Sequence, residues 1–387
     1  MKSSETNAYQ VSVNGQTPVD DVKKVNLANN IKETSINSYS NSHNFPHHPS
    51  QPKPLSIKAT SQDAALWVIE KYLPFRLWEA IQNPSGNQSI SNDLADSFVK
   101  WIVKNYPKML LNAQQQPHLT SDLTYSISAK VKNICQQNPV LWIVINSLGW
   151  LDHLELLSIL KNTYKFTLEQ EIQPKFSVIP TKTQYSKASL YIKQPPIHHS
   201  WKTDINKAFT KLGVGKRYTD NKLKSLHFDL NKKAYRLYCW ETLEFDRLYQ
   251  IPRDWHSVYE FETNHVLKGI AKKIDELVDN YPHPEKLQIV IASDCGQLIG
   301  MSEKISDLPV ALLEVKGRMA IGWTEDKRFV YLKGDRYGLP KDISIVRGSG
   351  YLSSFSYSAN QTVIDCHGGL FPEEVIVGMS ILKKLAK

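Results

Sequence analysis

Six consecutive apolar residues, Val140–Ile145, restrict the fold more than any other feature of the sequence. The run is rich in β-branched side chains, which favour strands. A strand that is apolar at every position is buried on both faces, which is typical of a parallel sheet covered by helices on both sides. Residues 151–160, shortly after this strand, are predicted to form such a helix.

The alternation of strand and helix continues along the chain. A long helix is predicted over residues 258–278, ahead of a strand at 287–292. Further strands are predicted over residues 176–179, 235–240, 318–323, 328–332 and 362–366. We therefore expect residues 137–387 to form an α/β domain, with a mostly parallel sheet covered by helices.

The first 136 residues differ from the rest of the chain. Residues 1–60 are rich in serine and asparagine and contain no tryptophan, so they bury too little apolar surface to fold, and we expect a disordered polar tail. Residues 61–136 are predicted to form a small helical region. Ser61 and Asp63 are expected to cap its first helix, Pro74 to interrupt that helix, and residues 93–106 to form a second helix.

Composition excludes several classes of protein. Of the 387 residues, 41% are hydrophobic and 22% are charged, which excludes a collagen-like or wholly disordered chain. No apolar run approaches the ~20 residues that a membrane-spanning helix needs. The first ten residues are polar, so no secretory signal is predicted.

Charge and cysteine content indicate a partner and a compartment. The formal net charge of +9 suits an anionic partner such as a phosphoester, a nucleic acid or a membrane surface, although lysines that face solvent explain it equally well. Cysteines occur at four positions, 135, 239, 295 and 366, and form no Cys-x-x-Cys pair. Since no disulfide framework is indicated, we expect a reduced, cytoplasmic protein.

Polar residues with metal-binding or catalytic chemistry follow the predicted strands. Ligands of open α/β sheets bind outside the carboxyl ends of the strands, so these residues are expected to meet at one place. They are Asn146, Thr181, Lys182, Thr183, Asp246, Asp294, Cys295 and His367. Carboxylate, thiol and imidazole groups hold metal ions, which stabilise the negative charge that develops in phosphoryl transfer. Each residue taken alone is equally well explained as a turn or capping residue.

The order of these motifs resembles that of the PglZ-domain branch of the alkaline phosphatase superfamily. The most specific motif, His-Gly-Gly-Leu-Phe-Pro-Glu-Glu-Val-Ile-Val at residues 367–377, is similar to the HGG-L-x-x-EE-V-V signature of that branch. Pro-Thr-Lys-Thr at 180–183 looks like its threonine loop, and Ser-Asp-Cys-Gly at 293–296 resembles its Ser-Asp-His-Gly. The helical stretch 67–106 is similar to the region that precedes many such domains, so the resemblance covers residues 61–387.

The resemblance implies a phosphatase-like site with two metal ions, usually zinc and alternatively manganese. The two implied ligand sets are Asn146, Thr183, Asp294 and Cys295 for the first ion, and Asp246, Gln250 and His367 for the second. In the family the loop threonine is the nucleophile or a metal-bridging hydroxyl, and Thr183 matches it best, with Thr181 second. Lys182 and Lys187 flank this threonine and are candidates to bind the substrate's phosphate oxygens, or else lie on the loop surface.

Three positions depart from the family pattern and weaken both metal sets. Asn146 and Gln250 carry neutral amides where Asp and His are expected, and Cys295 stands in place of His. Amide oxygens bind zinc poorly, whereas a thiolate binds it well. The second set retains two strong ligands, Asp246 and His367, fewer than the three usual in catalytic zinc sites. We therefore expect two-metal catalysis to be impaired.

Two main functional hypotheses follow. The first is a phosphomonoesterase or phosphodiesterase that acts on nucleotides or short oligonucleotides. The second is a catalytically inactive binding or scaffold member of a defence or signalling complex. The resemblance implies bacterial phage defence of the phage growth limitation or BREX type, with other defence-system proteins as partners. A metal sensor built from Cys295, Cys366 and His367 is a weaker hypothesis, because Cys366 lies in an apolar strand.

Overall fold

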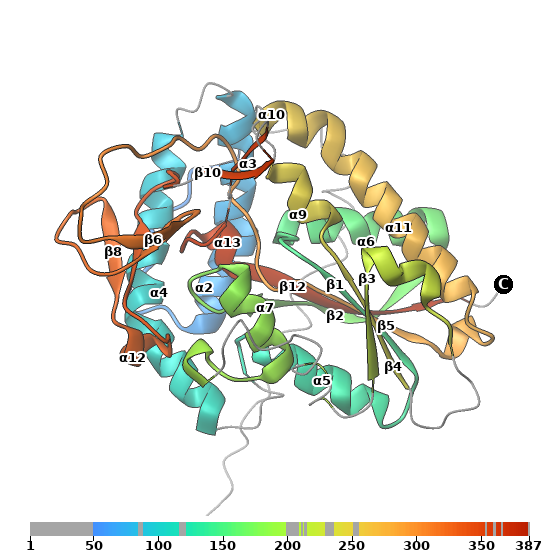
Figure 1. Ribbon diagram of the computed structural model, residues 1–387. Coiled ribbons are helices and arrows are strands. Elements are labelled where there is room, and N and C mark those ends of the chain that lie inside the picture. Colours follow the sequence, from blue (N-terminus) through green and yellow to red (C-terminus); the bar gives the residue numbers. More distant parts are fainter. Residues whose placement is uncertain are drawn as a thin grey trace, which may run out of the picture.

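The computed structural model describes most of the chain after residue 48 (Figure 1). The described residues are 49–83, 88–115, 121–198, 209, 212, 215–228, 236–250, 255–352, 354–358, 361–364 and 367–385. The predicted polar tail lies outside them up to residue 48. Residues 49–60 run without helix or strand along the helical region, where Leu55 is buried and its N–H donates to Ser97 Oγ (2.9 Å).

A six-stranded sheet forms the centre of the molecule, with strand order β2-β12-β5-β1-β4-β3. Five of these strands run in one direction, and β12 runs antiparallel to its neighbours. The strands are β1 (Val140–Ile145), β2 (Phe166–Phe176), β3 (Gly215–Thr219), β4 (Leu237–Thr242), β5 (Gln288–Ala292) and β12 (Ile376–Lys384). The predicted α/β fold with a mostly parallel sheet is therefore confirmed.

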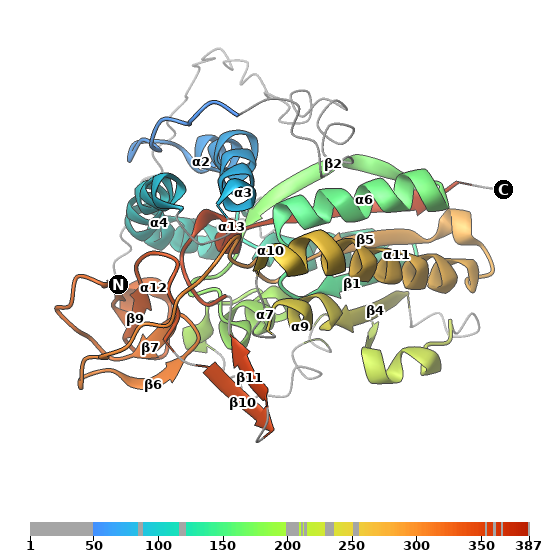
Figure 2. The ribbon, with the colours of Figure 1, turned by 90° about the horizontal axis from the view of Figure 1, so that it is seen from above.

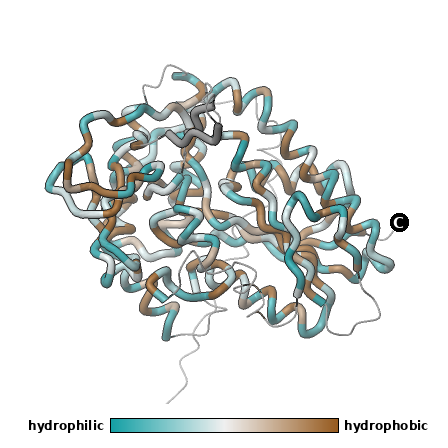
Figure 3. Tube along the Cα trace, in the orientation of Figure 1, coloured by the Kyte–Doolittle hydropathy of each residue, from teal (hydrophilic) through white to brown (hydrophobic). Residues whose placement is uncertain are grey.

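The central strand β1 explains why its sequence is apolar throughout. Leu141, Ile143 and Ile145 pack into the core beneath α6 and α11, whereas Trp142 and Val144 pack on the opposite face beneath α5 and α7. These helices are α5 (Tyr125–Cys135), α6 (Trp150–Tyr164), α7 (Thr183–Ile192) and α11 (Asn264–Asp279). Both faces of the sheet are thus covered, and Figure 3 shows hydrophobic residues along the central strands.

The helical region begins with a nearly continuous helix. It comprises α2 (Ser61–Trp67), the π-helical turn η2 (Val68–Tyr72) and α3 (Leu73–Gln82), and is followed by α4 (Ser89–Gln115). The predicted interruption at Pro74 is wrong. Pro74 falls in the first turn of α3, where a missing N–H is tolerated, and the wider π turn precedes it. Thr60, one residue before the predicted cap, makes the capping box with Asp63.

A smaller antiparallel sheet, of order β6-β7-β9-β8, lies beside α4 (Figures 1 and 2). It contains β6 (Leu313–Lys316), β7 (Met319–Ile321), β8 (Phe329–Leu332) and β9 (Ile343–Val346). The short helix α12 (Gly334–Tyr337) lies in the connection between β8 and β9. The predicted strands at 318–323 and 328–332 therefore belong to this sheet. The predicted strand at 362–366 falls on β11 (Gln361–Ile364), which pairs with β10 (Ser354–Ser358) outside the central sheet.

Three strands of the central sheet, β2, β3 and β12, escaped prediction. The predicted strand at 176–179 begins at the last residue of β2. The rest of β2 was missed because it mixes charged and apolar residues, and it does so because it lies at the sheet edge. β12 begins at Ile376, within the motif at 367–377, and was not predicted as a strand, and neither was β3. The remaining short helices include α9 (Glu244–Tyr249), α10 (Trp255–Ser257) and α13 (Pro372–Val375). No described helix combines the length and the apolar composition that crossing a membrane would require.

Candidate active site

The residues predicted from the strand ends meet at one edge of the central sheet. β1 leads into Asn146 and Ser147, β5 leads into Asp294, and β4 leads into α9, which carries Asp246. β2 leads into the N-terminus of α7. His367 reaches this edge by a route other than the predicted one. It precedes α13 and β12, and β12 starts at this edge because it runs antiparallel to its neighbours.

The buried carboxylate of Asp246 has three polar partners. Ser147 Oγ donates to Asp246 Oδ1 (2.7 Å), Gln250 Nε2 donates to Oδ2, and His367 Nε2 lies 3.3 Å from Oδ1. Burial alone would raise the pKa of Asp246, but the bonds and charge from His367, the bond from Ser147 and the charge of Lys187 hold it below its usual range. Asp246 is therefore an ionised carboxylate at neutral pH.

Cys295 lies beside the residues around Asp246. Its Sγ is 3.8 Å from Ser147 Oγ, and the side chain is fully buried. Burial, together with the negative charges of Asp294 and Asp246, raises the pKa of the Cys295 thiol well above its usual range. The group is therefore a neutral thiol in the metal-free chain, and zinc binding would have to displace its proton.

Asn146 and Asp294 form a second part of the site. Val144 pairs with Ala292, so two residues further on Asn146 and Asp294 leave neighbouring strands at the same level. Ser186 Oγ, from α7, donates to Asp294 Oδ2 (3.0 Å). Both polar atoms of the Asn146 side chain and Asp294 Oδ1 are buried without a hydrogen-bond partner. Such an atom costs about 1–3 kcal/mol while it lacks a partner, so a polar partner at this position would be stabilising.

The threonine loop joins the site to the His-Gly-Gly motif. Thr181 is buried, and its Oγ1 donates to Gly369 O (3.1 Å) and accepts from Gly368 N (2.9 Å). Its carbonyl oxygen accepts a hydrogen bond from His367 Nδ1 (3.1 Å). Thr181 is therefore engaged in holding two loops together. Thr183 is the first residue of α7 and is partly buried.

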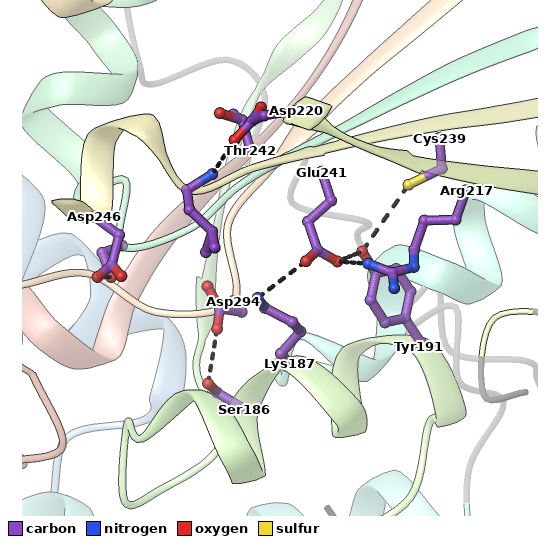
Figure 4. A network of polar contacts seen from close by, with 12 residues as sticks. Ser186, Lys187, Tyr191, Arg217, Asp220, Cys239, Glu241, Thr242, Asp246 and Asp294 are labelled. Atoms are coloured by element: carbon purple, nitrogen blue, oxygen red, sulfur yellow. Dashed lines mark hydrogen bonds and ion pairs between the residues drawn. The ribbon is translucent and has the colours of Figure 1, made fainter. Parts of the chain in front are cut away.

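The two lysines predicted to bind phosphate differ in environment. Lys182 is partly buried at the N-cap of α7. Lys187 is buried, and its Nζ donates to Glu241 Oε1 (3.1 Å; Figure 4). Glu241 Oε2 also accepts from Arg217 Nη1 and Tyr191 OH, both at 2.8 Å. Burial would raise the pKa of Glu241, but the charges of Lys187 and Arg217 lower it, so that Glu241 stays ionised.

Two buried arginines hold the segment that follows His367. Arg76 Nε lies 3.2 Å from Glu373 Oε1, and Arg318 Nε lies 3.1 Å from Glu374 Oε1. Both guanidinium groups also lie over the ring of Phe371, at 5.8 and 5.2 Å from its centroid. The Glu-Glu pair of the 367–377 motif therefore anchors this segment to the helical region and to the smaller sheet.

Glycines of two motifs allow this segment to pack closely. Gly296 N donates to Glu374 O (2.9 Å), and a Cβ on Gly296 would lie 2.1 Å from Glu373 O. A Cβ on Gly369 would lie 2.5 Å from Arg318 Nε. The Ser-Asp-Cys-Gly and His-Gly-Gly motifs thus need glycine because backbone and guanidinium groups fill the space of a side chain.

The donor set does not fit a pair of zinc ions. Among the described residues, no three His, Cys, Asp or Glu side chains lie together in a way that would hold a metal ion. Gln250 directs its amide nitrogen, and not its oxygen, toward Asp246. Lys187 also brings an ammonium group to this edge. The predicted ligands are thus gathered in one region without forming the two predicted coordination shells.

Several residues of this region were not predicted. Ser147 adjoins Asn146 and adopts a left-handed backbone (φ 61°), and Ser186 lies on the first turn of α7. Their sequence context offered little signal. Arg76 and Arg318 were detectable in principle, because a lone arginine within an apolar stretch such as residues 72–78 often has a buried partner.

No protein-family model matches the chain, and no curated protein matches it. One similar solved structure is murine ectonucleotide pyrophosphatase/phosphodiesterase 5, an inactive variant in complex with AMP, with 11% identity, a TM-score of 0.43, and 63% of this chain and 88% of that chain covered. Another is phosphonoacetate hydrolase from Sinorhizobium meliloti 1021 in complex with phosphonoformate, with 14% identity, a TM-score of 0.41, and 65% and 91% covered. At these identities and scores, the likenesses establish neither a family nor an activity for this chain.

Proposed function

We propose that this chain is a phosphoester-binding protein of the PglZ type, within the alkaline phosphatase superfamily, in which two-metal hydrolysis is reduced or absent. The observation that carries the proposal is the buried, unpartnered side chain of Asn146 beside Asp294 and the first turn of α7. An amide N–H and the N–H groups of a helix N-terminus are donors that suit a phosphate oxyanion. The three motifs at 180–183, 293–296 and 367–377 support the choice of superfamily.

The state of the predicted ligands supports the loss of two-metal hydrolysis. Asp246 already accepts hydrogen bonds from Ser147 and Gln250. Asn146 brings no negative charge, because its side chain is a neutral amide. Removing first-shell ligands should cost more than the 10–100-fold in metal affinity that outer-shell changes cost.

The setting that we propose is a bacterial phage-defence complex in the cytoplasm, of the phage growth limitation or BREX type. The chain would act there as a binding or scaffold member, with other defence-system proteins as partners. Support comes from the PglZ-like motif at 367–377 and from three free, buried cysteines, Cys135, Cys239 and Cys295, which suit a reducing compartment.

A second candidate is a metal-dependent phosphomonoesterase or phosphodiesterase, and one observation favours it. His367 donates from Nδ1 to the Thr181 carbonyl, which directs Nε2 to Asp246. Metal-binding histidines are commonly oriented in this way by a backbone carbonyl.

The test combines binding, metal content and turnover. We expect AMP to bind the wild-type chain in the presence of EDTA, measured by isothermal titration calorimetry, and to bind Asn146→Leu about tenfold more weakly because donors to the phosphate are lost. We expect no hydrolysis of a nitrophenyl phosphodiester that depends on Thr183, with zinc or manganese added. Two metals per chain by elemental analysis, with turnover abolished in Thr183→Ala, would establish the second candidate instead.

A further inference from the structure

Side chains supply positive charge at the site edge. Lys187 and Arg217 both bind the single carboxylate of Glu241, at 3.1 and 2.8 Å. The side chains of all three residues are at most 10% exposed. Two cations on one carboxylate leave one positive charge in excess, and water cannot screen it well at this depth.

This excess charge faces the remaining carboxylates of the site. Figure 4 shows the ammonium of Lys187 pointing between Glu241 and Asp294, while the neighbouring Ser186 donates to Asp294 Oδ2. Two consecutive residues of α7, Ser186 and Lys187, thus contact the carboxylates of Asp294, after β5, and Glu241, in β4.

We propose that Lys187 is a built-in counter-charge, which takes the electrostatic place of a metal ion and lets this edge bind a phosphoester oxyanion without a divalent cation. The proposal rests on the proposed function for the identity of the ligand. Arg217 already binds Glu241, so the charge of Lys187 is left to face Asp294 as well. A divalent cation beside Asp294 would meet the ammonium of Lys187 and be repelled.

Zinc binding provides a test that does not depend on activity. We compare wild type, Lys187→Met and Lys193→Met by equilibrium dialysis against zinc with elemental analysis. Lys193 is the matched control, because it lies at the C-cap of the same helix. We expect Lys187→Met to bind zinc roughly 10- to 100-fold more tightly than wild type and the control. Equal zinc affinity in all three proteins, or none in any of them, would overturn the proposal.

A second variant guards against failure to fold. Lys187→Met removes one of the two cations that bind the buried carboxylate of Glu241, so the double variant Lys187→Met/Glu241→Gln, which removes one charge of each sign, is measured alongside. We expect it to fold and to gain zinc affinity as well, and a folded double variant with wild-type zinc affinity would contradict the proposal.

AMP titration in EDTA separates this inference from the proposed function. If the wild type does not bind AMP while Lys187→Met gains zinc affinity, the proposed function is wrong but Lys187 still excludes the metal. If AMP binds the wild type and Lys187→Met has the zinc affinity of the wild type, the proposed function stands and the proposal that Lys187 replaces a metal ion is wrong.

Discussion

Asn146 illustrates how one side chain changes the chemistry of a site. It follows the end of the central strand, and both of its polar atoms lack a partner in the described structure. Because it is neutral, it avoids placing a second buried charge beside Asp294, whose Oδ1 also lacks a partner.

Restoring the carboxylate should therefore restore a need for metal. We expect Asn146→Asp to lower the free energy of unfolding in EDTA by about 3 kcal/mol, because two buried carboxylates then repel each other. Zinc or manganese should recover the loss, as measured by thermal unfolding with each ion. The control is Asn162→Asp, on the exposed side of α6. Unfolding of Asn146→Asp that is insensitive to metal would contradict the interpretation.

Asp152 is the residue from which we expect a pH dependence of stability. It lies in the first turn of α6, where burial, reinforced by the charge of Glu155, raises its pKa from 3.8 to about 7. As the pH rises, Asp152 thus loses its proton at a lower pH in the unfolded chain than in the folded one. The free energy of unfolding should fall as pH rises from about 4 to about 7, by at most about 4 kcal/mol because partial exposure screens the charge.

Urea denaturation across this pH range checks the expectation. The free energy of unfolding of Asp152→Asn should lack the fall that Asp152 causes between pH 4 and 7. That of the exposed control Asp335→Asn should show the same fall as the wild type. If Asp152→Asn follows the same pH course as the wild type, Asp152 is not the group responsible.

At the scale of elements, α13 and the loop before it are fixed by buried ion pairs. Arg318 bonds Glu374 and also donates to the carbonyls of Gly348 and Gly350, at 2.8 and 2.7 Å. Glu374 in turn accepts hydrogen bonds from Gly369 N and from Phe371 N, residues of the segment that carries His367. The position of His367 therefore depends on the turn between β6 and β7 of the smaller sheet.

We expect Arg318→Met to cost about 3–5 kcal/mol of unfolding free energy, because Glu374 is left buried without its partner. The double variant Arg318→Met/Glu374→Gln should recover part of this loss in urea denaturation. Arg328→Met, which breaks an exposed ion pair with Asp326, should change stability little. A cost for Arg318→Met no larger than that of the exposed control would refute the role of this pair.

At the scale of the whole molecule, α13 connects three parts of the fold (Figures 1 and 2). Tyr72 and Arg76 of the helical region bond Glu373, and Arg318 of the smaller sheet bonds Glu374. Gly296, after the central strand β5, bonds the backbone of the same segment. The helical region and the smaller sheet thus help to set the geometry of a site that lies on the central sheet.

We expect Arg76→Met to act at a distance. Hydrogen–deuterium exchange should increase in α13 and in the first residues of β12 as well as in α3, because the variant leaves Glu373 without its guanidinium partner. Lys100→Met, which breaks an exposed pair with Asp96 on α4, is the control and should change exchange only locally. Faster exchange confined to α3 would show that the three parts are not coupled through α13.

The sequence by itself determined the central α/β architecture and the edge of the sheet at which the site lies. The apolar run of β1 and the strand β5 were readable because strand burial imposes a local pattern on consecutive residues. Asn146 and Asp294 were then placed at that edge because they directly follow these strands. A local pattern suffices here, since each strand end carries its own polar residue.

Only the tertiary structure decided how those residues are used. The bond between Ser147 and Asp246 joins positions 99 residues apart, and that between Lys187 and Glu241 joins positions 54 apart. Such pairings depend on the order of the strands and on where α7 packs, which no local pattern encodes. For the same reason, β12 and the buried partners of Arg76 and Arg318 became visible only in the folded chain.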